Sequence, residues 1–174
     1  QERYFNWKAG LNAERNKNNW YGLPTNISFT DATISAIEEE QAYNSFKIFG
    51  NINFDDSYLE EANGSLNYFS DILSSSEFLI DADATFKFPL DNFHRQLNDL
   101  YINTTLSYLG GKFENSYETR NQLKHSFFTV GLHPTYKFVV QDLAIQLGAK
   151  TYFSLDIENK DNNFFIYPDV EISY

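Results

Sequence analysis

The chain has 174 residues, no cysteine, a net charge of −11 and an aromatic content of 18%. The lack of cysteine excludes disulfides and thiolate metal sites, and the acidic balance argues against nucleic-acid binding, which needs a basic surface. No apolar run approaches the length of a transmembrane helix.

The first two predicted strands alternate apolar and polar residues, a pattern that is typical of β-strands with one apolar face. They are "YFNWKAGLNAE" (4–14) and "YNSFKIFGNINF" (43–54). Between them, "TDATISAIEEEQ" (30–41) predicts a short helix that Thr30 or Asp31 can cap. The stretch "NNWYGLPTNISFT" (18–30) also permits an extra hairpin, so the organisation of 15–42 stays open.

Residues 55–77 predict a long acidic loop. The segment contains six Asp and Glu residues and no Lys or Arg. A charge run of this kind usually lies in solvent, so we interpret it as part of an acidic rim. The next predicted strand follows at once, in "FLIDADATFKFPLDNF" (78–93), where aspartates and a lysine alternate with an apolar series that begins at Phe78.

Four more segments in the C-terminal half alternate in the same way. They are "DLYINTTLSYLGG" (99–111), "HSFFTVGLHPTYKF" (125–138), "LAIQLGAKTYFSL" (143–155) and "FFIYPDVEISY" (164–174). Residues 139–142 predict a tight turn and 89–98 a moderate one, whereas 111–124 and the shorter 156–163 predict polar loops. Short and long connections therefore alternate between two rims, and 15–42 breaks the pattern because it is long and falls at the rim of short turns. The predicted strands exceed the five or six residues typical of soluble sheets, and they are long enough to cross a bilayer at the tilt of a barrel.

We therefore predict an all-β fold, a transmembrane antiparallel β-barrel of about seven strands that forms part of a larger barrel. Residues 1–174 contain no domain boundary and no plug domain. Tyr174 ends the chain as an outer-membrane assembly signal would, which is a competing detail in favour of a true C-terminus there. The alternative is a soluble β-sandwich, whose strands seldom need Phe or Tyr at both ends.

The barrel interpretation assigns the polar side chains of the strands to a wet lumen and the aromatic strand ends to the membrane interfaces. The predicted lumen-lining residues are Lys8, Lys47, Asp81, Asp83, Lys87, His133, Lys137, Lys150, Asp169 and Glu171. The predicted members of the aromatic girdles are Trp7, Phe86, Phe88, Tyr136, Phe138 and Phe164.

The sequence contains no convincing catalytic or metal-binding motif. His94, His125 and His133 lack the spacing of metal ligands, and "DIENKDNN" (156–163) lacks the glycine and the terminal Glu of a calcium loop. Asp81 and Asp83 form a carboxylate pair on one face, but no base, nucleophile or oxyanion donor accompanies them. We therefore expect no enzymatic activity, no metal and no cofactor.

Several segments resemble those of TonB-dependent-receptor-like outer-membrane barrels of Gram-negative bacteria. They are "NNWYGLP" (18–24), "FGNINFDDS" (49–57), "LGAKTYFSLD" (147–156) and "FFIYPDVEISY" (164–174), in the same order along the chain. The resemblance implies a β-barrel in the outer membrane, inserted by the barrel-assembly machinery. These are structural motifs, and neither a plug nor a TonB box is present to carry active import over to this chain.

The expected partners follow from that location. They are outer-membrane lipid, the barrel-assembly machinery and further envelope proteins such as a surface lipoprotein, whereas nucleic acid is not expected. The chain contains no methionine and begins with Gln1, as an exported protein does after processing or as part of a longer protein does. The expected function is uptake or binding of a ligand through the lumen and the extracellular loops. The alternatives are a structural subunit of a larger outer-membrane complex and a secreted β-sandwich binding module.

Overall fold

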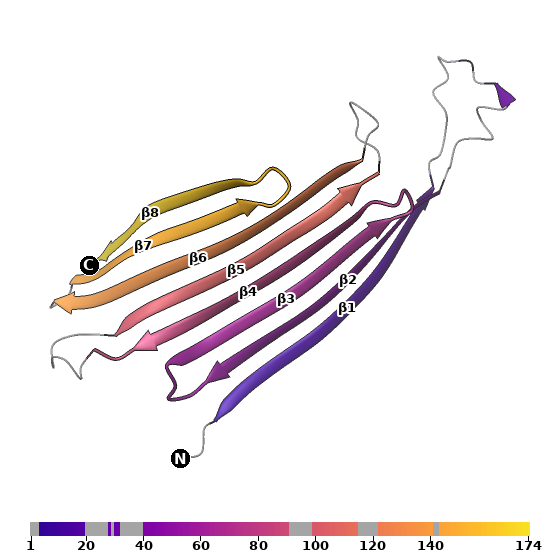
Figure 1. The fold of residues 1–174 in the computed structure, drawn as a ribbon. Coiled ribbons are helices and arrows are strands. Elements are labelled where there is room, and N and C mark those ends of the chain that lie inside the picture. Colours follow the sequence, from indigo (N-terminus) through magenta and orange to yellow (C-terminus); the bar gives the residue numbers. More distant parts are fainter. Residues whose placement is uncertain are drawn as a thin grey trace.

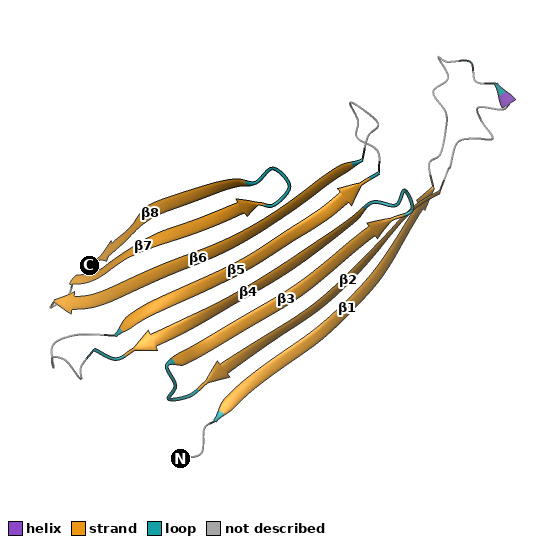
Figure 2. Cartoon of the chain, viewed as in Figure 1, coloured by secondary structure: helices purple, strands orange, loops and turns teal. Residues whose placement is uncertain are grey.

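The computed structural model describes residues 4–19, 28, 30–31, 40–90, 99–114, 122–140 and 143–174. Eight antiparallel strands form one sheet in which every strand pairs with its neighbours in the sequence (Figure 1). The strands are β1 (Phe5–Asn19), β2 (Glu40–Phe54), β3 (Leu59–Asp71), β4 (Ser76–Phe88), β5 (Leu100–Phe113), β6 (Leu123–Val140), β7 (Leu143–Asp156) and β8 (Asp161–Ser173). Figure 2 shows how strand dominates the described chain.

The all-β, antiparallel prediction is confirmed, but the strand count and the predicted acidic loop over 55–77 are wrong. Most of that segment is β3, which pairs with β2 on one side and with β4 on the other. The turns that flank it are short, at 55–58 and 72–75. Glu61, expected in a solvated loop, accepts hydrogen bonds of 2.9 Å from Asn51 and 3.2 Å from Asn63 within the sheet.

The additional strand changes which connections share a rim. The long link between β1 and β2 was expected at the rim of short turns, where it broke the pattern. With β3 in place, that link leaves from the same rim as the connections β3–β4, β5–β6 and β7–β8 (Figure 1). The predicted helix over 30–41 and the predicted extra hairpin over 18–30 lie largely outside the described residues.

The sheet is curved and open. Its order runs from β1 to β8 without pairing between the two end strands, so one edge of each remains unpaired, and the described part is not closed into a barrel. It is also a single layer: Ala42, with 1% of its surface exposed, is the only buried apolar residue among those described. No helix in the described ranges is long and apolar enough to cross a membrane.

The register places alternate residues of all eight strands on two faces of different chemistry. We name them the apolar face, which includes Trp7 and Ala84, and the polar face, which includes Lys8 and Asp83. One row of directly opposed residues on the polar face runs Lys8, Asn51, Asn63, Asp83, Thr105, Gly131. The adjacent row on the apolar face runs Ala9, Gly50, Gly64, Ala82, Leu106, Val130.

A register shift near the start of β3 preserves this division. Leu59 pairs with Phe86, whereas Glu61 pairs with Thr85, so Glu60 is the extra residue. A bulge of this kind changes the parity of the strand beyond it. As a result Leu59 lies on the apolar face with Phe86, although Glu61 two residues later lies on the polar face.

Candidate functional site

A hydrogen-bonded cluster occupies the polar face of β2, β3 and β4. Its members, which we name the amide–carboxylate network, are Asn51, Asn53, Glu61, Asn63 and Asp83. The Asn51 amide donates to Asn63 at 2.7 Å and to Glu61 at 2.9 Å, and the Asn63 amide donates to Asp83 at 2.9 Å. Asn53 donates to Asn51 at 2.7 Å. Because an asparagine side chain is both donor and acceptor, it can join neighbours on both sides.

Isolated pairs of polar side chains continue across the middle of the sheet. Ser107 donates a 2.7 Å hydrogen bond to Asp81 across β4 and β5, and Asn103 donates to Thr85 at 3.1 Å. Asp81 and Asp83 thus contact different partners on different strands. They do not converge on one reacting position, as a general acid and a general base would.

A hollow of about 380 Å³ lies over this network. Its lining includes Lys47, Phe49, Asn63, Asp81 and Asp83, so an aromatic ring, an ammonium group, an amide and two carboxylates border the same space. The Lys47 ammonium lies 5.9 Å from the centroid of the Phe49 ring. This set of groups can bind a polar solute through hydrogen bonds and can hold an apolar part of it against Phe49.

The Phe49 ring lies flat over Gly10, its directly opposed partner on β1. A Cβ atom built on Gly10 would approach the ring to 2.3 Å, so this glycine makes room for the ring. The Phe49 ring can therefore lie against the sheet, whereas a larger residue at position 10 would push the ring into the hollow.

A second polar cluster lies on β6, β7 and β8. The His133 Nε2 atom is 2.7 Å from an Asp169 carboxylate oxygen, and the Lys150 ammonium is 3.7 Å from the same oxygen. Two ring contacts border it, between Tyr152 and Tyr167 at 6.4 Å and between Phe165 and Tyr167 at 6.4 Å. This cluster contains one carboxylate, an imidazole and an ammonium group. It lies several strands away from the amide–carboxylate network.

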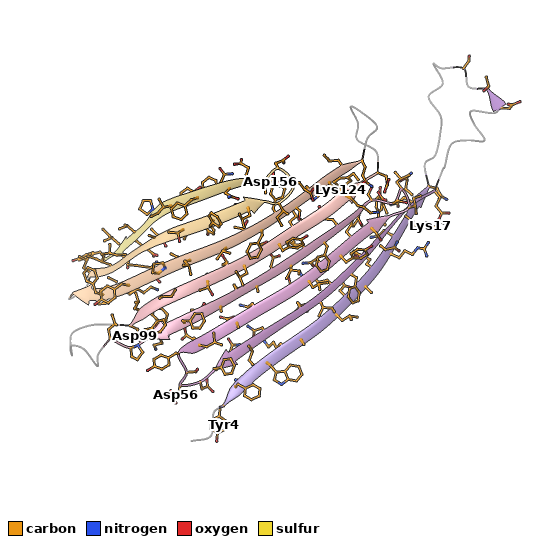
Figure 3. The ribbon with its side chains drawn as sticks, in the orientation of Figure 1. Tyr4, Lys17, Asp56, Asp99, Lys124 and Asp156 are labelled. Carbon is orange, nitrogen blue, oxygen red and sulfur yellow. The ribbon has the colours of Figure 1, made fainter. Side chains whose placement is uncertain are left out.

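Another hollow, of about 540 Å³, is at the rim that carries the 55–58 turn. Asp56, Glu60 and Asp99 line it together with Lys87, whose ammonium is 3.1 Å from the Asp99 carboxylate. Figure 3 labels Asp56 and Asp99 at this rim and Lys124 and Asp156 at the opposite one. The rim hollow is acidic, and its one lysine is already paired.

All ten predicted lumen-lining residues lie on the polar face of the sheet. By register they extend from Lys8 on β1 to Asp169 and Glu171 on β8. They do not form one site, because they spread over the whole face and only some contact each other. Whether this face lines a lumen stays a prediction. Sequence reasoning missed Asn51, Asn63 and Glu61 as contact-forming residues, although Asn51 and Asn53 occupy alternate positions that signal a polar face.

The six predicted girdle residues lie on the apolar face. Phe86 and Phe88 stack with ring centroids 6.5 Å apart, and Tyr136 and Phe138 do so at 6.0 Å. Trp7 and Phe164 are about two-thirds exposed. Their role at a membrane interface stays a prediction as well.

Two of the three histidines fall within the described residues. His125 stacks on Phe113 at 5.7 Å and lies 3.7 Å from the Glu77 carboxylate, whereas His133 contacts Asp169. His94 lies outside the described residues. The part of the chain that the structure describes holds no group of three or more potential metal-ligating side chains.

Known proteins give no guide to this site. A comparison with protein-family models found no match, and neither did searches of curated proteins and of solved structures. These results do not bear on the resemblance to TonB-dependent-receptor-like barrels. The function is therefore inferred from the chemistry of the two faces.

Proposed function

We propose that this sheet is part of the wall of a transmembrane β-barrel in the outer membrane, of the receptor or transport class. Its apolar face contacts lipid and its polar face lines a hydrated passage. The observation that carries the proposal is the exposed apolar face of a single-layer sheet. Trp7, Ile48, Leu106 and Ile166 are 45–66% exposed on it. A contiguous apolar surface of this extent needs a lipid or protein partner.

The height of the apolar face matches a membrane. On β1 its outward residues run from Phe5 to Ala13 and are followed by Arg15, so the apolar segment spans nine residues. At about 3.4 Å per residue and a tilt of about 40°, nine residues span roughly 23 Å. The apolar band of outer-membrane barrels is about 25 Å tall.

The polar face supports the same orientation, because Glu61, Asp81 and Asp83 carry carboxylates that are too costly to face lipid. Their hydrogen bonds to asparagine and serine form a surface that water or a polar solute can contact. The hollow beside Phe49 is the natural place for such a solute. Uptake or binding of a polar ligand through this passage and the connecting loops is therefore the function we propose.

The two alternative functions differ in what they require. A structural barrel subunit would use the same wall, so only the absence of solute passage or binding would favour it. A soluble β-sandwich needs a second sheet over the apolar face. Within the described residues there is one sheet, and nothing covers that face.

The absence of natural cysteine makes a labelling test straightforward. Two single-cysteine variants of the full chain would be compared in intact membranes, Ser65→Cys on the polar face and Ala82→Cys on the apolar face of the neighbouring strand. A water-soluble maleimide is expected to label Ser65→Cys, whereas Ala82→Cys becomes reactive only after denaturation. Equal labelling of both variants before denaturation would overturn the membrane-wall proposal.

A further inference from the structure

A row of polar residues follows directly beyond the apolar segment, still on the apolar face. Its six directly opposed members are Arg15, Asn44, Ser70, Ser76, Lys112 and Lys124. Three of them are cationic and none is acidic, in a chain whose net charge is −11. The row lies toward the rim at which Figure 3 labels Lys17 and Lys124.

Two lysines of this row are directly opposed. Lys112 on β5 pairs with Lys124 on β6, and like charges in such positions repel each other. Lys112 is 3.5 Å from Glu114, whose carboxylate also accepts a 2.9 Å hydrogen bond from Gln122. Lys124 forms no salt bridge with any described residue. An anion placed between the two ammonium groups would remove the repulsion.

The space for that anion is a hollow of about 330 Å³ beside the two lysines. The hydroxyl groups of Ser76, Tyr108 and Ser126 border it as well, and Tyr108 and Ser126 are hydrogen-bonded at 3.1 Å. Gly110 leaves room for the tyrosine, because a Cβ atom there would lie 2.8 Å from the Tyr108 hydroxyl. One hydroxyl of the Tyr108–Ser126 pair donates to the other, so the donors left for a ligand are two ammonium groups and two hydroxyls, a set that suits phosphate oxygens.

Two carboxylates also border the hollow. Glu77 belongs to the polar face, where its carboxylate lies 3.7 Å from His125. Glu158 belongs to the turn between β7 and β8. Neither forms a salt bridge with Lys112 or Lys124. Lys112 shares its charge with Glu114 at 3.5 Å, so Lys124 is the described lysine of this pair that is left for an external anion.

We propose that this hollow binds the phosphate-bearing headgroup of an anionic membrane lipid. The hollow continues into the apolar face through Tyr68 and Phe78, which also line it. A ligand here would meet apolar surface, then aromatic rings, then hydroxyls and then ammonium groups, which is the order of chemistry along a lipid from its acyl chains to its phosphate. A free phosphate would contact only the hydroxyls and the ammonium groups. The inference rests on the proposed membrane orientation.

The test uses the full chain in nanodiscs of phosphatidylcholine that contain a minor fraction of phosphatidylglycerol. Native mass spectrometry of the protein released with its bound lipids measures the enrichment of phosphatidylglycerol. The wild type is expected to enrich it, and the variant Lys112→Gln/Lys124→Gln is expected to lose about tenfold or more, because each lysine near an anionic lipid surface contributes about fivefold in affinity. The matched control is Lys8→Gln/Lys47→Gln, with the same charge change on the polar face, and it should keep the enrichment.

Three results would overturn the lipid site. These are no enrichment by the wild type, equal losses in the double variant and its control, and displacement of the lipid by millimolar inorganic phosphate. If the double variant fails to insert, the wild type alone still decides, since enrichment at this site must fall as salt rises. Labelling of Ser65→Cys and Ala82→Cys in the same nanodiscs separates the two proposals: normal labelling without enrichment rejects only the lipid site.

Discussion

Asn63 and Asp83 are directly opposed on β3 and β4, and the asparagine amide donates a 2.9 Å hydrogen bond to the aspartate carboxylate. Ala62, one residue before Asn63, and Ala84, one residue after Asp83, are directly opposed on the other face. Adjacent positions thus face different environments within one strand pair. This arrangement allows each face to be tested with neighbouring substitutions.

Ala84→Arg should destabilise the protein by about 2–4 kcal/mol in a bilayer, because it places a cation on the face that the proposed orientation turns toward lipid. Asp83→Asn should change stability by less than about 1 kcal/mol, since the new amide oxygen can still accept from Asn63. Denaturant unfolding in lipid vesicles, followed by heat-dependent gel migration, measures both. A larger loss for Asp83→Asn than for Ala84→Arg would mean that the two faces are assigned the wrong way round.

Much of the sheet could be predicted from sequence, because a two-residue period over ten or more residues marks a strand with two distinct faces. β3 was missed for a local reason. Asn63 and Gly64 form the dipeptide that most strongly signals a hairpin turn, and Glu60 and Glu61 add charge to the same segment. In the sheet Gly64 instead lies between Gly50 and Ala82, so pairing on both sides overrides the turn preference.

The composition of the polar face was predictable, whereas its contacts were not. Asp83 was assigned to that face from the alternation of 78–93. Its partner Asn63 lies on the strand that had been interpreted as a loop, so the network Asn51–Asn63–Asp83 could not be derived. Contacts between strands depend on register, and one missing strand changes the neighbours of all the residues beside it.

Among the described glycines, Gly148 on β7 is the one where an added Cβ atom would lie under 3.0 Å from a backbone atom. A Cβ atom there would lie 2.8 Å from the Pro134 carbonyl oxygen and 2.8 Å from Thr135 Cγ2. In the β6–β7 ladder, His133 and Pro134 are skipped between the pairs of Leu132 and Thr135, and Pro134 has no N–H to donate there. We expect Gly148→Ala to destabilise the protein by about 1–3 kcal/mol, measured by the same denaturant unfolding, because backbone must move to admit the methyl group.

Gly64→Ala is the control for that substitution, since the nearest atom to its added Cβ would be 4.0 Å away, at the Asp81 carbonyl oxygen. It should be neutral or stabilising by up to about 1 kcal/mol, because alanine restricts the unfolded chain. Equal effects of the two alanines would show that the approach of β6 to Gly148 does not constrain the sheet.

The turn between β7 and β8 provides a pH-dependent contact outside the apolar band. Asp156 accepts hydrogen bonds from the Asn159 side chain at 2.7 Å and from the Asn159 and Glu158 backbone N–H groups at 3.0 and 3.1 Å. The Asn159 side chain, followed by its backbone N–H, lowers the pKa of the Asp156 carboxyl below its usual value. The stabilisation is therefore present above the ordinary aspartate pKa, and it is lost as the pH falls through the lower pKa of the folded state. Carboxyl NMR titration in detergent micelles should show Asp156 titrating below the usual aspartate value. The Asn159→Ala variant should raise the Asp156 pKa and speed hydrogen exchange of the Glu158 amide. The control Asn163→Ala removes an amide beyond the turn and should leave both quantities unchanged. An unaltered Asp156 pKa in Asn159→Ala would contradict the assigned cause.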